Sequence, residues 1–113
     1  MTRFNIRTIE ALLADLGVLP PNKHQEYTVK AILMYENTVP KVIYVYHVVA
    51  KACDTTPQAI ERGIRVSCRK VITSHNKQLL KEIFGANATD LETITNREFL
   101  ASIAAYLRRC SNG

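Results

Sequence analysis

The fold of this chain is decided by the stretch Tyr46-His-Val-Val-Ala-Lys-Ala-Cys-Asp-Thr-Thr-Pro-Gln-Ala-Ile-Glu-Arg-Gly-Ile-Arg65. Its residues are spaced as in a helix-turn-helix, where two helices cross at a steep angle over a tight turn. Ala50 is small enough to let the helices approach closely, and Asp54 tolerates the left-handed backbone that the turn requires. Ile60 is the apolar residue that points back at the first helix. The stretch therefore predicts a helix-turn-helix over about residues 40–72.

The second helix of this motif has two chemically different faces. Thr55 or Thr56 is placed to cap it, and Pro57 suits its first position. At about 100° per residue, one face carries Ile60, Ile64, Ser67, Cys68 and Val71. The opposite face carries Gln58, Arg62, Arg65 and Arg69, flanked by Glu61 and Val66. We expect the helix to pack by the first face and to present the second to a partner.

The second face suits double-stranded DNA. Arginine can pair with guanine in the major groove or bind phosphate, and the first turns of a recognition helix meet the base edges. The predicted base contacts are Gln58, Glu61, Arg62 and Arg65. The predicted phosphate contacts are Thr56, Arg69, Lys70, Lys51 and Lys41. Tyr44 and Tyr46 are left open between phosphate contact and packing.

The positive charge of the chain is concentrated in the same motif. The 113 residues carry a formal net charge of +5. Between residues 39 and 77 there are seven basic and two acidic residues, whereas the rest of the chain holds eight of each. A basic segment of this kind is the electrostatic footprint of a protein that binds a phosphate backbone. The charge pattern therefore favours nucleic acid as the partner.

The remaining segments also have helical patterns, and we expect an all-α fold. The expected helices span about residues 6–16, 22–35, 40–52, 56–72, 77–84 and 95–109. Only four glycines and four prolines interrupt the chain, which is too few for a β fold with many turns. The length of 113 residues fits one compact domain. We therefore predict a single domain over residues 1–113 with about six helices.

Two of these helices carry predictions that the structure can test. Residues 40–52 are rich in β-branched side chains, which favour strands, and we assign them to a helix on length and context, with Pro40 in the first turn. In the helix at 22–35, the expected buried face consists of Tyr27, Ala31, Met34 and Tyr35.

Other classes of function lack a signal in the sequence. Three cysteines without a Cys-x-x-Cys motif, and three scattered histidines, argue against a disulfide framework or a zinc site. No glycine-rich phosphate loop, nucleophile elbow or metal-binding helix motif is present. We therefore expect no enzyme, no catalytic residue, no metal, no cofactor and no small-molecule substrate. Without a signal peptide or a membrane span, we expect a cytoplasmic, nucleoid-associated protein with no membrane partner.

At this point the motifs are similar to a known family. The segment Thr55-Thr-Pro-Gln-Ala-Ile-Glu-Arg-Gly-Ile-Arg65 resembles the recognition helix in the C-terminal DNA-binding domain of the sporulation master response regulator. Thr95-Asn-Arg-Glu-Phe99 with Ala104–Arg108 resembles the last helix of that domain, and Leu16-Gly-Val18 the end of its first. The resemblance covers about residues 6–109.

The resemblance carries its own expectations. It implies a six-helix effector domain, winged-helix-like without a clear wing, that binds a short DNA box as tandem copies or a homodimer. It implies that Glu61 and Arg62 contact bases in the major groove. Contact with RNA polymerase is a further expectation.

Two departures from the family pattern leave an alternative open. The family usually has a basic residue where Ala59 stands and a polar or aromatic residue near Val66. The regulator of this family also carries a receiver domain, and this chain has no room for one. We therefore expect a stand-alone protein. The alternative is an excised domain. The second function is therefore a degenerate effector-like domain that acts as a protein-interaction module or modulates a full-length regulator. RNA binding ranks below both, because no aromatic residues interleave the basic stripe.

Overall fold

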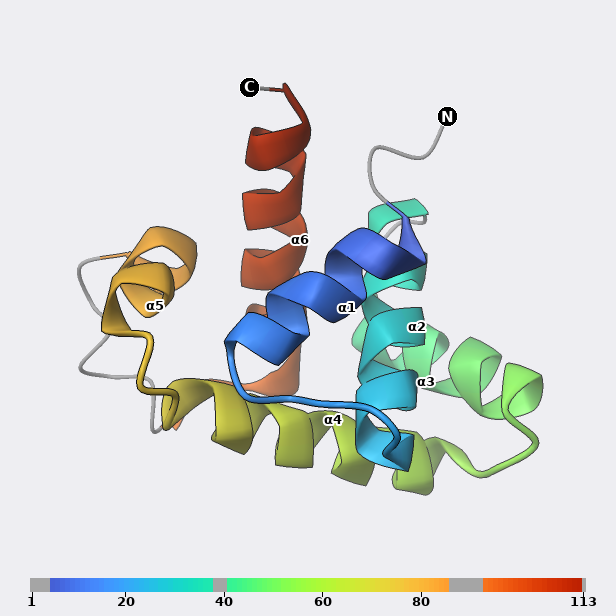
Figure 1. Cartoon of the computed structure of the whole chain (residues 1–113). Coiled ribbons are helices and arrows are strands. Elements are labelled where there is room, and N and C mark those ends of the chain that lie inside the picture. The colour runs from blue at the N-terminus through green and yellow to red at the C-terminus, as the bar shows by residue number, and fades with distance from the viewer. Residues whose placement is uncertain (1–4, 38–40, 86–92, 113) are drawn as a thin grey trace.

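The described part of the chain forms six helices (Figure 1). The computed structural model describes residues 5–37, 41–85 and 93–112. The helices are α1 (Ile6–Asp15), α2 (Lys23–Asn37), α3 (Val42–Ala52), α4 (Pro57–Ile72), α5 (Lys77–Phe84) and α6 (Asn96–Asn112). Across these residues there is no strand. The predicted all-α fold of about six helices is therefore confirmed.

Local sequence signals set the ends of several helices. Gly17 follows α1 with φ of 93°, and Gly85 ends α5 with φ of 82°, both in the left-handed region that favours glycine. The start of α6 is a capping box: the Thr95 amide donates to Glu98 Oε1 at 3.0 Å, and the Glu98 amide donates to Thr95 Oγ1 at 3.1 Å. These reciprocal bonds confirm the predicted start of the last helix.

The β-branched segment is helical, as predicted. Helix α3 has Lys41 at its N-cap and buries Val45, Val49 and Ala50. Pro40, expected in the first turn, lies outside the described residues. The helix packs against both α2 and α4. Burial against these neighbours overrides the strand preference of its side chains, because β propensity depends strongly on context.

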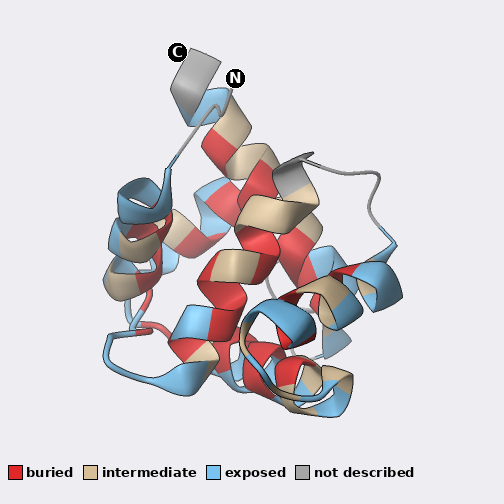
Figure 2. Ribbon diagram, turned by 90° about the vertical axis from the view of Figure 1, so that its right-hand side faces the viewer, coloured by how far each residue is buried: buried red, intermediate tan, exposed pale blue. Residues whose placement is uncertain are grey.

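Helix α2 is the centre of the domain, since it packs against α1, α3, α4 and α6. Figure 2 shows the buried residues gathered where the helices face one another, with the exposed residues outside. The face predicted for α2 was partly wrong. Tyr27 and Ala31 are buried, but Met34 and Tyr35 are only partly so. Contacts on several sides widen the buried face, which also contains Gln25, Thr28, Val29 and Ile32.

Helix α6 closes the core along one side of α2. Phe99, Ile103 and Leu107 are buried, which confirms the predicted inward face. Phe99 stacks on Phe84 of α5 with ring centroids 6.4 Å apart, a separation typical of favourable aromatic pairs. In Figure 1, α4 runs along the lower edge of the view, with α2 and α6 standing above it. The core therefore supports α4 from one side only.

Among the described helices, none combines the length and the apolar character that a membrane crossing requires.

Candidate nucleic-acid interface

The turn between α3 and α4 has the geometry that the sequence predicted. The amide of Thr55 donates to the carbonyl of Ala50 at 2.9 Å, which closes the turn. Asp54 has φ of 55° and is the only non-glycine residue with a positive φ in the described part of the chain. Of the two candidate threonines, Thr56 caps α4, because its side chain accepts from the Ala59 amide at 3.1 Å. The helix-turn-helix is therefore held by local bonds.

The inner face of α4 is locked onto α2. Ser67 is fully buried; its hydroxyl donates to the carbonyl of His24 at 3.1 Å and lies 2.7 Å from Thr28 Oγ1. Cys68 is also buried, and burial raises the pKa of its thiol to about 11. Both residues pack on the core side, as predicted. Because α4 is fixed on this face, its rotation about its own axis is set.

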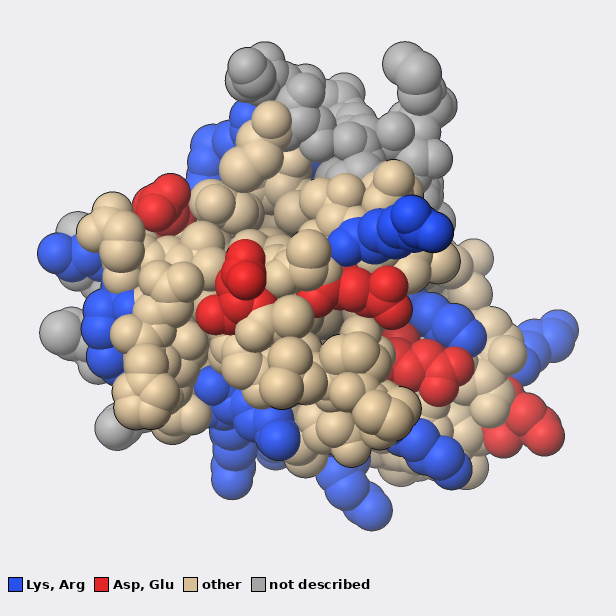
Figure 3. All heavy atoms as spheres, in the orientation of Figure 1, with Lys and Arg blue, Asp and Glu red and all other residues tan. Residues whose placement is uncertain are grey.

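The outer face of α4 is open to solvent. The exposed residues on it are Gln58, Arg62, Arg65 and Arg69. Val66 beside them is 38% exposed. Figure 3 shows basic side chains projecting from the lower edge of the molecule, where α4 runs. Three of the four predicted base-reading residues, Gln58, Arg62 and Arg65, therefore lie on one accessible strip with Arg69, whereas Glu61 beside it is half-buried.

Two of the predicted base-reading residues pair with each other. Arg65 Nη2 lies 2.6 Å from Glu61 Oε1, one helical turn away, and both side chains are partly exposed. An exposed pair of this kind contributes little to stability. The ion pair instead sets the orientation of the Arg65 side chain, because it holds the guanidinium beside the Glu61 carboxylate.

The predicted phosphate-binding residues do not form one cluster. Thr56 stands at the N-cap of α4, and Arg69 and Lys70 lie in its last turn. Lys41 and Lys51 lie at opposite ends of α3, about 15 Å apart at about 1.5 Å per residue. These residues are therefore spread over both helices of the motif, with Arg69 on the exposed strip itself.

A buried link joins the start of α6 to the motif, and sequence reasoning missed it. The side-chain amide of Asn96 donates to Tyr46 Oη at 3.1 Å and to the carbonyl of Glu61 at 3.0 Å. Tyr46 is partly buried and packs against the core, and this burial raises the pKa of its hydroxyl. The three residues are far apart in the sequence, and no local pattern signals their contact.

Beside this link lies a cleft of about 430 Å³ between α3, α4 and the start of α6. Its walls include the apolar side chains of Val42, Ile72 and Ile94. Three arginines also line it: Arg65, Arg69 and Arg97. Among the described residues that line the cleft there is no carboxylate. The cleft is thus a positively charged hollow next to the exposed strip.

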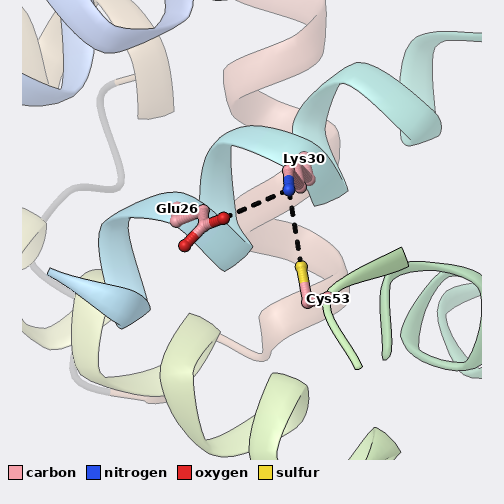
Figure 4. Close-up of polar contacts among 3 residues, drawn as sticks. All are labelled: Glu26, Lys30 and Cys53. Carbon is pink, nitrogen blue, oxygen red and sulfur yellow. Dashed lines mark hydrogen bonds and ion pairs between the residues drawn. The ribbon is translucent and has the colours of Figure 1, made fainter. Parts of the chain in front are cut away.

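A polar contact ties the turn of the motif to the central helix (Figure 4). Lys30 Nζ donates to Glu26 Oε1 at 3.1 Å and to Cys53 Sγ at 3.7 Å. The hydrogen bond to Glu26 raises the pKa of Lys30. Cys53 is the C-cap of α3, so the contact connects α2 to the end of the first motif helix.

No three metal-ligating side chains gather anywhere in the described ranges.

Comparison with known families decides the identity of the domain. The sequence model of the family described as "Sporulation initiation factor Spo0A C terminal" matches residues 9–107. The chain belongs to this family. The Spo0A C-terminal domain is a non-catalytic, DNA-binding effector domain. The predictions of DNA binding and of no enzyme activity are therefore confirmed for this chain.

The family match reaches from the first helix to the last. The match begins within α1 and ends within α6, so it includes the helix-turn-helix and the capping box at Thr95. In this member of the Spo0A C-terminal family, α4 is the second helix of the motif and has an open basic face.

Proposed function

We propose that this domain is a sequence-specific regulator of transcription that reads double-stranded DNA with α4 in the major groove. One observation carries the proposal: α4 is locked to α2 by buried Ser67 on one side and presents Arg62, Arg65 and Arg69 on the other. A helix held in this way can enter a groove without reorganising. Within the domain at residues 1–113, the reading unit is the helix-turn-helix at about 40–72.

The proposed roles follow from position along α4. Gln58, Glu61, Arg62 and Arg65 lie in its first turns or on the exposed strip and would contact bases. Thr56, Arg69, Lys70, Lys51 and Lys41 would contact phosphates and set the register on the duplex. Tandem copies or a homodimer on DNA, contact with RNA polymerase, and a cytoplasmic, nucleoid-associated location complete the proposal.

The experiment compares Arg62→Ala with Lys70→Ala, after selection of the preferred site from random duplex DNA. Arg62→Ala should cost about 1–3 kcal/mol at that site and relax base choice at one position. Lys70→Ala should weaken binding to selected and scrambled duplexes by the same factor. Lys81→Ala, an exposed change on α5, is the matched control. Unchanged binding by both test variants in a gel shift at moderate salt would contradict the proposal.

A second candidate function is a protein-interaction module. It is favoured by Ile43 and Tyr44, neighbours on α3 that are 67% and 53% exposed. Exposed large apolar residues that lie together often mark a protein contact. Under this alternative, Ile43→Ser should change the mass measured by light scattering. If the wild-type protein and the variant are both monomers, and a pull-down finds no partner, the alternative is contradicted.

A further inference from the structure

We propose that the start of α6 belongs to the DNA-binding surface: Arg97, together with Arg69 of α4, binds one phosphodiester group of the DNA backbone in the cleft beside the recognition helix. The inference rests on the proposed function and adds a residue from outside the helix-turn-helix.

The first observation is convergence of charge from two helices. Arg69 from the last turn of α4 and Arg97 from the first turn of α6 line the same cleft, with Arg65 beside them. Within the described parts of the chain, neither Arg69 nor Arg97 forms an ion pair, whereas Arg65 is paired with Glu61. Two guanidinium groups without a carboxylate partner leave the cleft electrostatically unbalanced.

The second observation is that Glu98 and Glu61, the described acidic residues closest in sequence to Arg97 and Arg65, already have partners. Glu98 follows Arg97, but its carboxylate accepts from the Thr95 amide in the capping box. Glu61 is held by Arg65. Among the described residues, an anion in the cleft would therefore meet two arginines that form no ion pair. Guanidinium groups match a phosphate with paired, charge-assisted hydrogen bonds.

The third observation is that the cleft is already formed. Asn96 bridges Tyr46 Oη and the carbonyl of Glu61, which fixes the start of α6 against α4. The backbone positions of Arg69 and Arg97 are therefore set before binding, and preorganisation of this kind lowers the cost of binding. The amides in the first turn of a long helix add positive potential.

The position of the cleft points to DNA as the source of the phosphate. Arg65 and Arg69 line the cleft and also belong to the exposed strip of α4. A duplex whose major groove receives α4 brings its backbone to both sides of that helix. The cleft lies on one of these sides, so a backbone phosphate can reach Arg97 while α4 contacts bases.

The test measures DNA affinity by fluorescence anisotropy at roughly 50 to 200 mM salt, on the selected duplex and on a scrambled one. Arg97→Ala should weaken binding to both duplexes by the same factor. Loss of one phosphate contact lowers the slope of log affinity against log salt by about 1. Wild-type protein should therefore lose about 3- to 4-fold more affinity than the variant across this range.

Two control variants test whether the effect depends on the charge and on the position of Arg97. Arg97→Lys keeps the charge and should keep most of the salt dependence. Arg7→Ala removes an exposed arginine from α1, which does not line the cleft, and should bind as wild type does. Since Arg97 is exposed, we expect the thermal unfolding curves of all variants to superimpose.

The outcomes separate this inference from the proposed function. If Arg62→Ala relaxes base choice while Arg97→Ala leaves affinity and salt slope unchanged, the inference is overturned and the proposed function stands. If wild-type protein binds no duplex, both fail. A change in base preference with Arg97→Ala would also overturn it. The inference would also be overturned if Arg97 were needed to bind inorganic phosphate while Arg97→Ala left the DNA salt slope unchanged. The cleft would then bind a free phosphate compound.

Discussion

Gly63 of α4 lies directly against the ring of Tyr27 of α2. A Cβ added to Gly63 would lie 2.8 Å from Cδ2 of Tyr27 and 3.5 Å from Cα of His24. Tyr27 itself is buried, so the ring has little room to turn aside. The glycine therefore lets the recognition helix settle close to the central helix, and this contact sets the distance at which α4 stands from the core.

Gly63→Ala is expected to destabilise the domain by about 1–3 kcal/mol through overpacking, although alanine is favoured over glycine in an open helix by about 1 kcal/mol. Urea unfolding measures the change in the free energy of unfolding. In a Tyr27→Ala background the ring is gone, and the same substitution should become neutral or stabilising. The same sign of effect in both backgrounds would show that the Tyr27 ring is not what restricts Gly63.

Ser67→Ala should cost about 1 kcal/mol, the usual net value of one hydrogen bond. The cost stays moderate because Thr28 Oγ1 also lies 2.7 Å from the carbonyl of His24 and keeps that acceptor. Thermal unfolding measures this loss of stability. Ser102→Ala, at a partly buried position on α6, is the control. Equal shifts in melting temperature for the two variants would argue against a specific role for the buried contact.

Asp54→Gly should leave stability unchanged or raise it, whereas Asp54→Val should lower it by about 1–2 kcal/mol, because a β-branched residue tolerates the left-handed region poorly. The φ of 55° at Asp54 is the reason. Denaturant unfolding of both variants gives the comparison. Asp15→Val, at the last residue of α1, controls for loss of the charge. If Asp54→Gly lowers the free energy of unfolding more than Asp54→Val does, the turn does not depend on the backbone conformation of residue 54.

Stability should depend on pH through Glu98. Its pKa is lowered first by the hydrogen bond from the Thr95 amide and then by the Thr95 hydroxyl. A lowered pKa in the folded state means that the contribution is present above the pKa of the unfolded chain and is lost as pH falls through the lowered value. The stability gap between wild type and Glu98→Gln should therefore shrink between about pH 7 and about pH 3. A gap that stays constant in urea unfolding at both pH values would contradict this.

Most of the helix-turn-helix could be predicted from the sequence, because its signals act between near neighbours. Asp54 adopts the left-handed turn and Thr56 caps α4. The start of α6, outside the motif, was predicted in the same way from the capping box of Thr95 and Glu98. Such bonds join residues within one turn of a helix, so their residue types and spacing are sufficient. The division of α4 into a buried and an exposed face follows from the helical period in the same way.

What only the tertiary structure decided is which helices meet and through which atoms. The buried face of α2 is wider than its own pattern predicts, because four other helices pack around it. The link from Asn96 to Tyr46, and the position of Arg97 beside Arg69 in one cleft, join residues far apart in the chain. The sequence by itself determined the helices, their caps and the basic strip, since these depend on local backbone and periodicity. The packing of α6 against α4 placed Arg97 beside that strip, because side chains from separate helices share a site only after the core has brought them together.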